Sequence, residues 1–190
     1  MGDNEIAGPP LDVRRMLNAL NDHHVDYVVV GGIAALIHGA TRATKDADIV
    51  VDGHTRNLQN LLRALSALRA RARTETESGD YDNAGNAAAG RPRWHLDDVE
   101  HSFVSLQTAA GSLDVMPSLA GPNGRLTYQD LIADAATFSY AEDAVTIKVA
   151  SLAHIIASKR SANRPKDLEA LPELETLNQP ADPEANNEHS

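Results

Sequence analysis

The chain has 190 residues, which is enough for one globular domain with a substantial core and too few for two domains of ordinary size. Its net charge of −10 argues against a protein that binds nucleic acid nonspecifically through its whole surface. No cysteine is present, so disulfides, thiolate metal sites and cysteine nucleophiles are excluded.

The first ten residues and the longest apolar run predict neither a signal peptide nor a membrane span. The start "MGDNEIAGPP" lacks the basic and apolar parts of a signal peptide, and the longest apolar run, residues 27–37, is shorter than the ~20 residues that a membrane span needs. We therefore expect a soluble, cytoplasmic protein. Residues 1–10 predict a flexible N-terminus, 11–176 a single domain, and 177–190 a disordered acidic tail.

Apolar spacing predicts the elements of the first third of the chain. A helix ending near residues 21–24 follows from one apolar stripe formed by Val13, Met16, Leu17 and Leu20. Residues 25–30 are rich in branched side chains and predict a strand, and 47–51 predict the next one. Between these strands, Gly31-Gly32 predicts a turn from which residues 33–38 begin a short helix.

The middle of the chain predicts a helix and then a long irregular segment. The helix begins near Asn57 and has the clearest apolar stripe of the protein: Leu58, Leu61, Leu62, Leu65 and Leu68. Residues 74–98 are rich in Gly, Asn and Asp and predict a loop or lid. Its single Trp94 either pins this loop to the core or stacks on a base.

The remaining third predicts short strands followed by helices. Residues 103–106 and 112–116 predict a hairpin around "TAAG", and 145–149 predict a last strand. A helix from Ser151 breaks at Pro165, and "KDLEALPEL" begins a short final helix.

Positive charge is concentrated in two places although the chain is acidic overall. Arginines cluster at 63–73 in the predicted middle helix, and Lys159, Arg160, Arg164 and Lys166 lie close together near the end of the domain. A local basic groove therefore stays open as a hypothesis.

Asp46 and Asp48 form the most informative pair of side chains. Strand alternation places both on one face, while Ala47, Ile49 and Val51 form the core face. The two Cα atoms of such a pair are roughly 6.6 Å apart, so both carboxylates can bind one divalent ion or a pair of ions. The alternative is the solvent-exposed face of a strand's first residues.

Phosphate-binding groups lie near this pair in the sequence. Gly31-Gly32 lets the helix that follows offer backbone N–H groups to an anion, although glycine pairs are often only tight turns. Arg42 and Thr44 add further donors. Asp114, between apolar residues of a predicted strand, supplies a third carboxylate for two-metal phosphoryl transfer unless it ends its strand at the surface.

Lys159 lies on the buried stripe of its predicted helix, within about 20° of Leu152 and on the side of Ile155 and Ile156. A lysine there either snorkels to solvent or serves an internal anion such as a triphosphate. Lys148, at the end of the last strand, is a weaker candidate for the same role.

These motifs resemble the DNA polymerase β-like nucleotidyltransferase superfamily. "GG", thirteen residues and then "DAD", sharpened by "RATKDAD", resembles its signature. The stretch "IKVASLAHIIASKRSANRPKDLEALPEL" resembles the end of the AbiEii branch, particularly the mycobacterial MenT-type toxins. The resemblance implies an α/β fold with a mixed sheet flanked by helices and a helical C-terminal part, over about residues 25–174.

The resemblance also implies roles for particular residues. Asp46 and Asp48, with Asp114 as a third carboxylate, would hold Mg²⁺ or Mn²⁺. Gly31 and Gly32 would lie near the nucleotide phosphates, Thr44 beside the metal site, and Lys159 would contact the triphosphate. Arg42 and Lys148 stay nucleotide-binding candidates from their positions in the sequence alone. Asp167 in "RPKDL" would be a further catalytic carboxylate.

The activity that the resemblance implies is transfer of a nucleotide, preferentially a pyrimidine, from a nucleoside triphosphate to the 3′ acceptor end of tRNA. Such transfer blocks aminoacylation and translation, and a cognate antitoxin protein is the expected partner. Two alternatives stay open: nucleotidylation of a protein or small-molecule hydroxyl, and an inert nucleotide-binding or partner-binding module.

Overall fold

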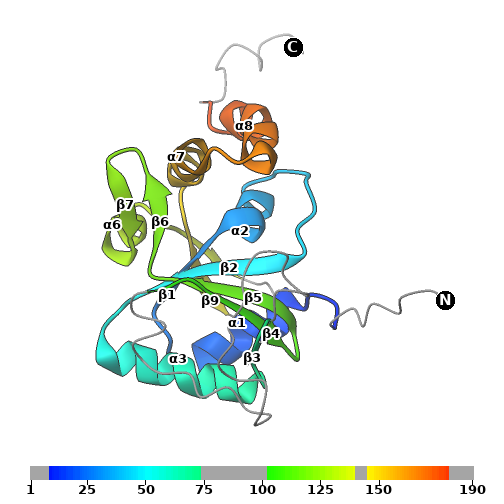
Figure 1. Ribbon diagram of the computed structural model, residues 1–190, viewed down its shortest axis with the longest axis vertical. Helices are drawn as coiled ribbons and strands as arrows, with labels where there is room; N and C mark the ends of the chain where they lie inside the picture. The colour runs from blue at the N-terminus through cyan, green and yellow to red at the C-terminus, as the bar shows by residue number, and fades with distance from the viewer. Residues whose placement is uncertain (1–8, 74–101, 140–144, 180–190) are drawn as a thin grey trace, which may run out of the picture.

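The computed structural model describes residues 9–73, 102–139 and 145–179 (Figure 1). The predicted loop or lid 74–98 with its Trp94, and nearly all of the acidic tail, lie outside the described residues. Within the described part, no helix is long and apolar enough to cross a membrane.

A seven-stranded mixed sheet forms the centre of the molecule. Its strand order is β3-β4-β5-β2-β1-β9-β8, with β1 antiparallel to β2, and with β2 parallel to β5 and β1 parallel to β9. The bounds in that order are Arg71–Ala72, Val104–Thr108, Gly111–Met116, Asp46–Val51, Tyr27–Val30, Thr146–Val149 and Ala136–Ser139.

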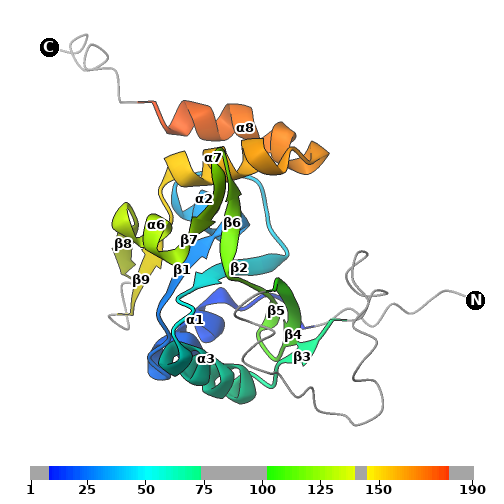
Figure 2. The same cartoon turned by 60° about the vertical axis from the view of Figure 1, so that its left-hand side comes forward.

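Helices cover both faces of this sheet (Figures 1 and 2). One face carries α1 (Val13–Asp22) and α3 (Thr55–Ala67). The other carries α2 (Gly31–Ile37), α7 (Leu152–Ala162) and α8 (Pro165–Leu177). The mixed α/β fold expected from the sequence is confirmed.

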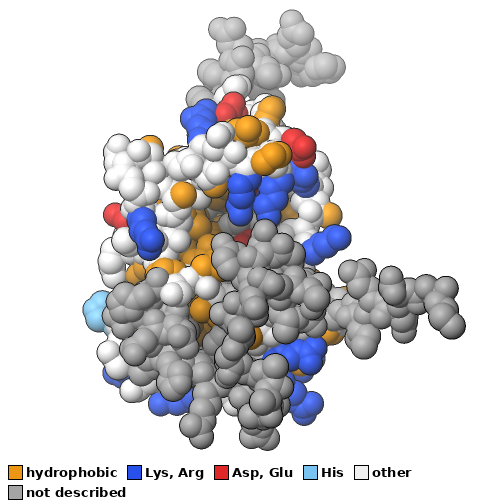
Figure 3. All heavy atoms as spheres, in the orientation of Figure 1, with side chains coloured by type: hydrophobic (Ala, Val, Ile, Leu, Met, Phe, Trp, Pro, Cys, Tyr) orange, Lys and Arg blue, Asp and Glu red, His pale blue; other side chains and the backbone are white. Residues whose placement is uncertain are grey.

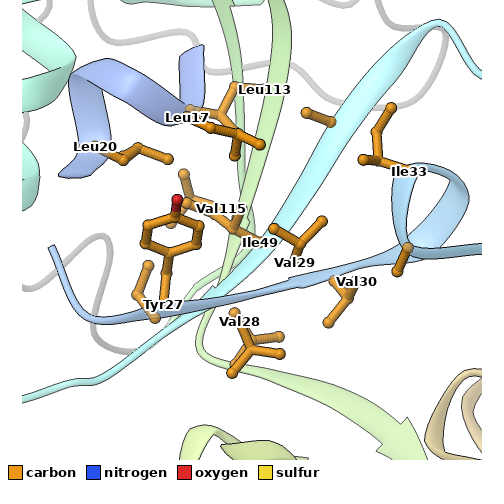
Figure 4. Close-up of a cluster of buried hydrophobic side chains, with 14 of the residues drawn as sticks. Leu17, Leu20, Tyr27, Val28, Val29, Val30, Ile33, Ile49, Leu113 and Val115 are labelled. Atoms are coloured by element: carbon orange, nitrogen blue, oxygen red, sulfur yellow. The ribbon is translucent and has the colours of Figure 1, made fainter. Parts of the chain in front are cut away.

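The core between α1 and the sheet is mostly aliphatic, in keeping with the low aromatic content of the chain. Leu17 and Leu20 of α1 pack towards Tyr27, Ile49 and Val115 of the strands (Figure 4), and all five are buried. Ala47, Ile49 and Val51 are buried as their alternation predicts. Ala47, Ile49 and Val51 thus form a core face of β2, and the opposite face begins with Asp46 and Asp48, which are partly buried.

The segment after β5 contains elements that the sequence interpretation missed. A two-stranded sheet of β6 (Ser118–Gly121) and β7 (Gly124–Thr127) is followed by α6 (Tyr128–Ala133). The strands are short and partly exposed, so they lack a strong apolar alternation. A usable signal was present in "TYQD", because Thr127 and Asp130 form a capping box at the start of α6.

Two predicted helix boundaries are wrong. The final helix begins at Pro165 and has 13 residues, so it is longer than expected. Proline is favoured as the first residue of a helix because its missing N–H would have no helical acceptor there. The middle helix ends at Ala67, so Arg69, Arg71 and Arg73 lie beyond it, and Arg71 belongs to the edge strand β3.

Candidate active site

A cleft of ≈ 270 Å³ opens where the start of α2, the start of β2 and the facing sides of α7 and α8 meet. The three sequence-predicted aspartates of the strands line this cleft, and so do Gly31, Gly32, Arg42, Thr44, Lys159 and Asp167. Segments far apart in the chain thus bring almost every predicted site residue to one place.

The two glycines are the first residues of α2, which differs from the predicted turn before residues 33–38. Gly31 has a φ of +61°, and a Cβ there would lie 2.0 Å from Asp48 Oδ2. A Cβ on Gly32 would lie 2.6 Å from Thr44 Oγ1. Because no side chain fits at either position, the helix can begin directly against the carboxylate of Asp48.

The sheet register places the acidic residues side by side. Asp48 pairs with Asp114 across the parallel β2–β5 ladder, and Asp46 lies two residues before Asp48 on the same face. Thr44 Oγ1 donates a hydrogen bond to Asp46 Oδ1 at 2.9 Å. Three carboxylates therefore share the floor of the cleft.

Desolvation and neighbouring negative charge both act on Asp48. Burial raises the pKa of Asp48 to about 7, and the negative charges of Asp46 and Asp114 act in the same direction. The Gly32 backbone N–H and the charge of Lys166 oppose this increase. A carboxyl group in this state gains from any cation that binds beside it.

Asp114 has partners that the sequence interpretation did not find. Ser105 of β4 lies opposite it in the antiparallel ladder and donates from Oγ to Asp114 Oδ1 at 2.6 Å. An Arg73 guanidinium nitrogen lies 3.9 Å from the same oxygen. Burial raises the pKa of Asp114, while the Ser105 hydrogen bond and Arg73 oppose the increase. Asp114 is therefore better compensated than Asp48.

The opposite wall is basic. Lys159 Nζ lies 3.1 Å from Asp167 Oδ1, and Arg164 Nε lies 2.6 Å from Asp167 Oδ2. Burial acts to raise the pKa of Asp167, but the hydrogen bonds from Arg164 and Lys159 outweigh it and lower the pKa. The buried-stripe position of Lys159 is thus explained by a buried anionic partner.

Arg164 and Lys166 line the cleft although the sequence interpretation gave neither a site role. The signal was their place in the basic segment around "RPKDL". Lys and Arg side chains gather on the face below α8 (Figure 3). The cations among the lining residues are Arg42, Lys159, Arg164 and Lys166.

Two other predicted residues have structural partners. Arg42 forms an exposed ion pair with Glu169 of α8 at 3.0 Å, at the edge of the cleft. Lys148 is exposed on β9, donates from Nζ to Thr137 Oγ1 at 2.7 Å and is not among the residues that line the cleft. The structure therefore does not bring Lys148 to the other site residues.

The acidic floor fits a hard divalent cation. Mg²⁺ in nucleotide enzymes is held by one or two carboxylates together with substrate phosphates and water. Asp46 and Asp48 supply such a pair, and their mutual repulsion favours a bound cation. Within the described residues, no three acidic or histidine side chains converge into a complete metal cage. Asp46 and Asp48 are thus the two carboxylates that would hold such an ion.

Comparison with known structures identifies the class of the fold. A Thermotoga maritima protein assigned as a nucleotidyltransferase aligns with a TM-score of 0.52 and 15% identity, over 86% of this chain and 90% of that chain. The lincosamide antibiotic adenylyltransferase LnuA, bound to lincomycin, aligns with a TM-score of 0.54 and 16% identity, over 89% and 99% of the two chains. The chain has the polymerase β-like nucleotidyltransferase fold.

The family follows from the sequence. Residues 15–169 match the family model described as nucleotidyl transferase AbiEii toxin, type IV toxin-antitoxin system. A search of curated proteins gives no significant match. The chain therefore belongs to the AbiEii nucleotidyltransferase toxin family, and the resemblance drawn from the sequence is confirmed at this level.

Proposed function

We propose that this toxin transfers a nucleotide, preferentially a pyrimidine, from CTP or UTP to the 3′ end of tRNA in a Mg²⁺-dependent reaction. The observation that carries the proposal is the half-buried carboxylate of Asp48, which lies beside Asp46 and against the glycine start of α2. This arrangement offers metal ligands and phosphate donors within one cleft.

The acidic floor has the central role in this proposal. Asp46 and Asp48 would hold Mg²⁺ or Mn²⁺, which would supply positive charge to neutralise the reacting phosphates. Asp114 lies in register with Asp48 and adds negative charge at the side of the floor farther from α2. The tRNA 3′ hydroxyl forms a bond to the α-phosphorus, its proton passes to a carboxylate of the floor or to water, and pyrophosphate leaves with the electron pair of the broken P–O bond.

The nucleotide phosphates have their donors on the other side. Gly31 and Gly32 place backbone N–H groups near the floor without side chains in the way. Thr44 orients Asp46 through its hydrogen bond, and Lys159 contacts the triphosphate. Arg42 adds positive charge at the rim. Lys148 has no role in this proposal because its contacts lie elsewhere.

Membership of a type IV toxin family supports the biological part of the proposal. Extension of the tRNA acceptor end would block aminoacylation and hence translation. A cognate antitoxin would relieve this block, and we propose that such a protein is the partner of this chain.

The decisive experiment incubates the purified protein with tRNA, Mg²⁺ and each labelled nucleoside triphosphate in turn. We expect label in RNA, strongest with CTP or UTP. Asp46→Asn and Asp48→Asn should lower the rate by about 10³-fold or more, because each removes a ligand charge. Asp134→Asn, an exposed aspartate outside the cleft, is the matched control. Absence of labelling with all four triphosphates would refute the proposal.

A second candidate keeps the same site with a different acceptor. The net charge of −10 is unfavourable for an RNA-binding surface and favours a protein or small-molecule hydroxyl. The similar adenylyltransferase LnuA is described as acting on lincosamides, so lincomycin is a reasonable probe. Label on a protein band or on the drug, with none on RNA, would decide for this candidate.

An inert binding module is the remaining alternative. A module without catalytic activity would have no need for Asp46 and Asp48 side by side at the cleft floor. Burial and mutual repulsion disfavour their ionised forms there. Equal toxicity of the parent protein and the Asp46→Ala, Asp48→Ala double variant in cells would favour it.

A further inference from the structure

One end of the cleft floor is apolar and open. Among the described residues, three large apolar side chains are exposed: Phe103, Leu168 and Leu177. Phe103, which is 42% exposed, is the one of these three that lines the cleft. Met116 lines the cleft too and is partly buried, and Leu119 of β6 adds further apolar lining. Phe103 and Met116 are here called the apolar platform.

The sheet register places the apolar platform directly beside the acidic floor. Asp48 and Asp114 form one cross-strand pair of β2 and β5, and Val50 and Met116 form the next pair on the same face. Phe103 directly precedes β4, so it lies beside Met116 at the end of the β4–β5 ladder. The row of carboxylates is therefore followed, roughly 6.6 Å along the strands, by a row of apolar side chains.

The apolar platform lies on the side of the floor away from α2. The strand order is β4-β5-β2-β1, and α2 begins at Gly31, directly after β1 and against Asp48. Met116 belongs to β5, on the other side of β2. In phosphoryl transfer the attacking and leaving oxygens lie roughly in line on opposite sides of the phosphorus. With the triphosphate at the start of α2, the platform is on the side of the attacking hydroxyl.

An exposed aromatic ring at this place suits the base of an RNA acceptor. Every nucleobase has a flat π-face that stacks on aromatic side chains. The flexible thioether of Met116 can adapt to bases of different size. The base and the 3′ hydroxyl of a nucleotide are carried by the same ribose. An acceptor whose hydroxyl reaches Asp114 therefore has its own base about one sugar away, where the apolar row begins.

We propose that Phe103 and Met116 hold the terminal base of the RNA acceptor, with the ring of Phe103 stacked on that base and the 3′ hydroxyl of the same nucleotide at the acidic floor. This inference rests on the proposed function, because the acceptor belongs to that same site. A base can stack on the ring only when it is unpaired, so the acceptor class is RNA with an unpaired 3′ end.

The test compares two acceptors that differ in one base. One is a short RNA that ends in CCA, as tRNA does, and the other is the same RNA with a terminal ribose that lacks its base. Fluorescence anisotropy of the 5′-labelled RNAs measures binding to the full chain, with Mg²⁺ and a CTP analogue that cannot transfer its nucleotide. We expect loss of the base to weaken binding to the parent protein about 5- to 50-fold.

Variants of Phe103 show whether the ring is responsible. Phe103→Ala should weaken binding of the complete RNA about 5- to 50-fold and change binding of the RNA without the terminal base by no more than about twofold. Phe103→Leu keeps apolar volume without a π-face and should behave like Phe103→Ala. Phe103→Tyr keeps the ring and should stay within about threefold of the parent protein.

Two controls separate this effect from general damage to the protein. Leu177→Ala removes another exposed apolar side chain, at the end of α8 and outside the cleft, and should leave RNA binding unchanged. Binding of CTP alone to Phe103→Ala should stay within about twofold, because the platform lies away from α2. That result also shows that the variant is folded, as the exposure of Phe103 leads us to expect.

The inference is overturned if the parent protein binds neither RNA or binds both equally, or if Phe103→Ala weakens both equally or weakens CTP binding. The proposed function fails separately. Base-dependent RNA binding without labelled RNA supports the apolar platform and refutes the transfer reaction. Labelled RNA with unchanged RNA binding in Phe103→Ala refutes the platform and keeps the transfer reaction.

Discussion

Asp48 and Asp167 are both carboxylates in the wall of one cleft, yet the protein treats them in opposite ways. Asp48 lies beside Asp46 and Asp114, and burial with these like charges raises its pKa to about 7. Asp167 is buried too, but Arg164 and Lys159 lower its pKa. The protein's own cations engage both oxygens of Asp167, whereas like charges surround Asp48.

This difference shows that burial alone does not identify a functional carboxylate, because the partners of the carboxylate also matter. The sequence resemblance implied catalytic roles for both residues. The contacts separate Asp48, which lies among like charges, from Asp167, which two cations engage. Variants that remove one charge at a time can test this separation directly.

The largest expected effect on stability is at Asp167. Asp167→Asn should lower the free energy of unfolding by roughly 2–4 kcal/mol, because it leaves Lys159 without its buried partner. Urea denaturation without metal or nucleotide measures this change. Asp134→Asn at an exposed position is the control. A loss below 0.5 kcal/mol for Asp167→Asn, roughly the effect of an ordinary surface substitution, would contradict the buried ion pairs.

The start of α2 should be nearly as sensitive. Gly31→Ala combines a positive φ with a Cβ 2.0 Å from Asp48 Oδ2. We expect a loss of about 2–4 kcal/mol in stability together with reduced activity. Gly53→Ala is the matched control, since nothing lies within 4 Å of a Cβ there. Equal midpoints for the two variants would show that α2 does not begin against Asp48.

The pH dependence of stability should differ between the two carboxylates. The folded protein keeps the Asp48 proton up to about pH 7, while the unfolded chain loses it near its ordinary pKa of 3.8. The stability that this proton provides is complete below about pH 4 and is lost as the pH rises to 7. The free energy of unfolding of Asp48→Asn should therefore exceed that of the parent protein by about 1–3 kcal/mol at pH 8 without metal, and by less at pH 4.

The Asp167 contribution runs in the other direction. Because the pKa of Asp167 is lowered, its stabilisation is present above about pH 4 and is lost as the pH falls further. The loss in free energy of unfolding of Asp167→Asn relative to the parent protein should be constant between about pH 5 and 8 and should become smaller at lower pH. Denaturation curves at several pH values in EDTA measure both trends, and parallel pH profiles for the two variants would refute the contrast.

The smallest expected effect is at Lys148. Because its Nζ contacts Thr137 and it does not line the cleft, Lys148→Ala should change nucleotide transfer by no more than about twofold. Lys159→Ala, by comparison, should lower transfer about 10²-fold through the lost phosphate contact. Similar losses in both variants would show that Lys148 reaches the substrate.

Much of the fold could be predicted because it depends on local regularities. The stripe of Val13, Met16, Leu17 and Leu20 predicted α1, and alternation around Ala47, Ile49 and Val51 predicted which face of β2 is buried. The β6–β7 sheet and β8 were missed. Their strands have only four residues and are partly exposed, so no apolar period marks them.

The features of the candidate site also fall into two groups: those that local periodicity predicted and those that tertiary packing decided. By itself, the sequence determined that Asp46 and Asp48 share a strand face and that Lys159 lies on a buried helix stripe, because the periods of strands and helices depend only on backbone geometry. Tertiary structure alone decided that Ser105 and Arg73 reach Asp114, that Asp167 holds Lys159 and Arg164, and that Lys148 lies away from the cleft. The identities of such partners depend on how distant segments pack, which no local period specifies.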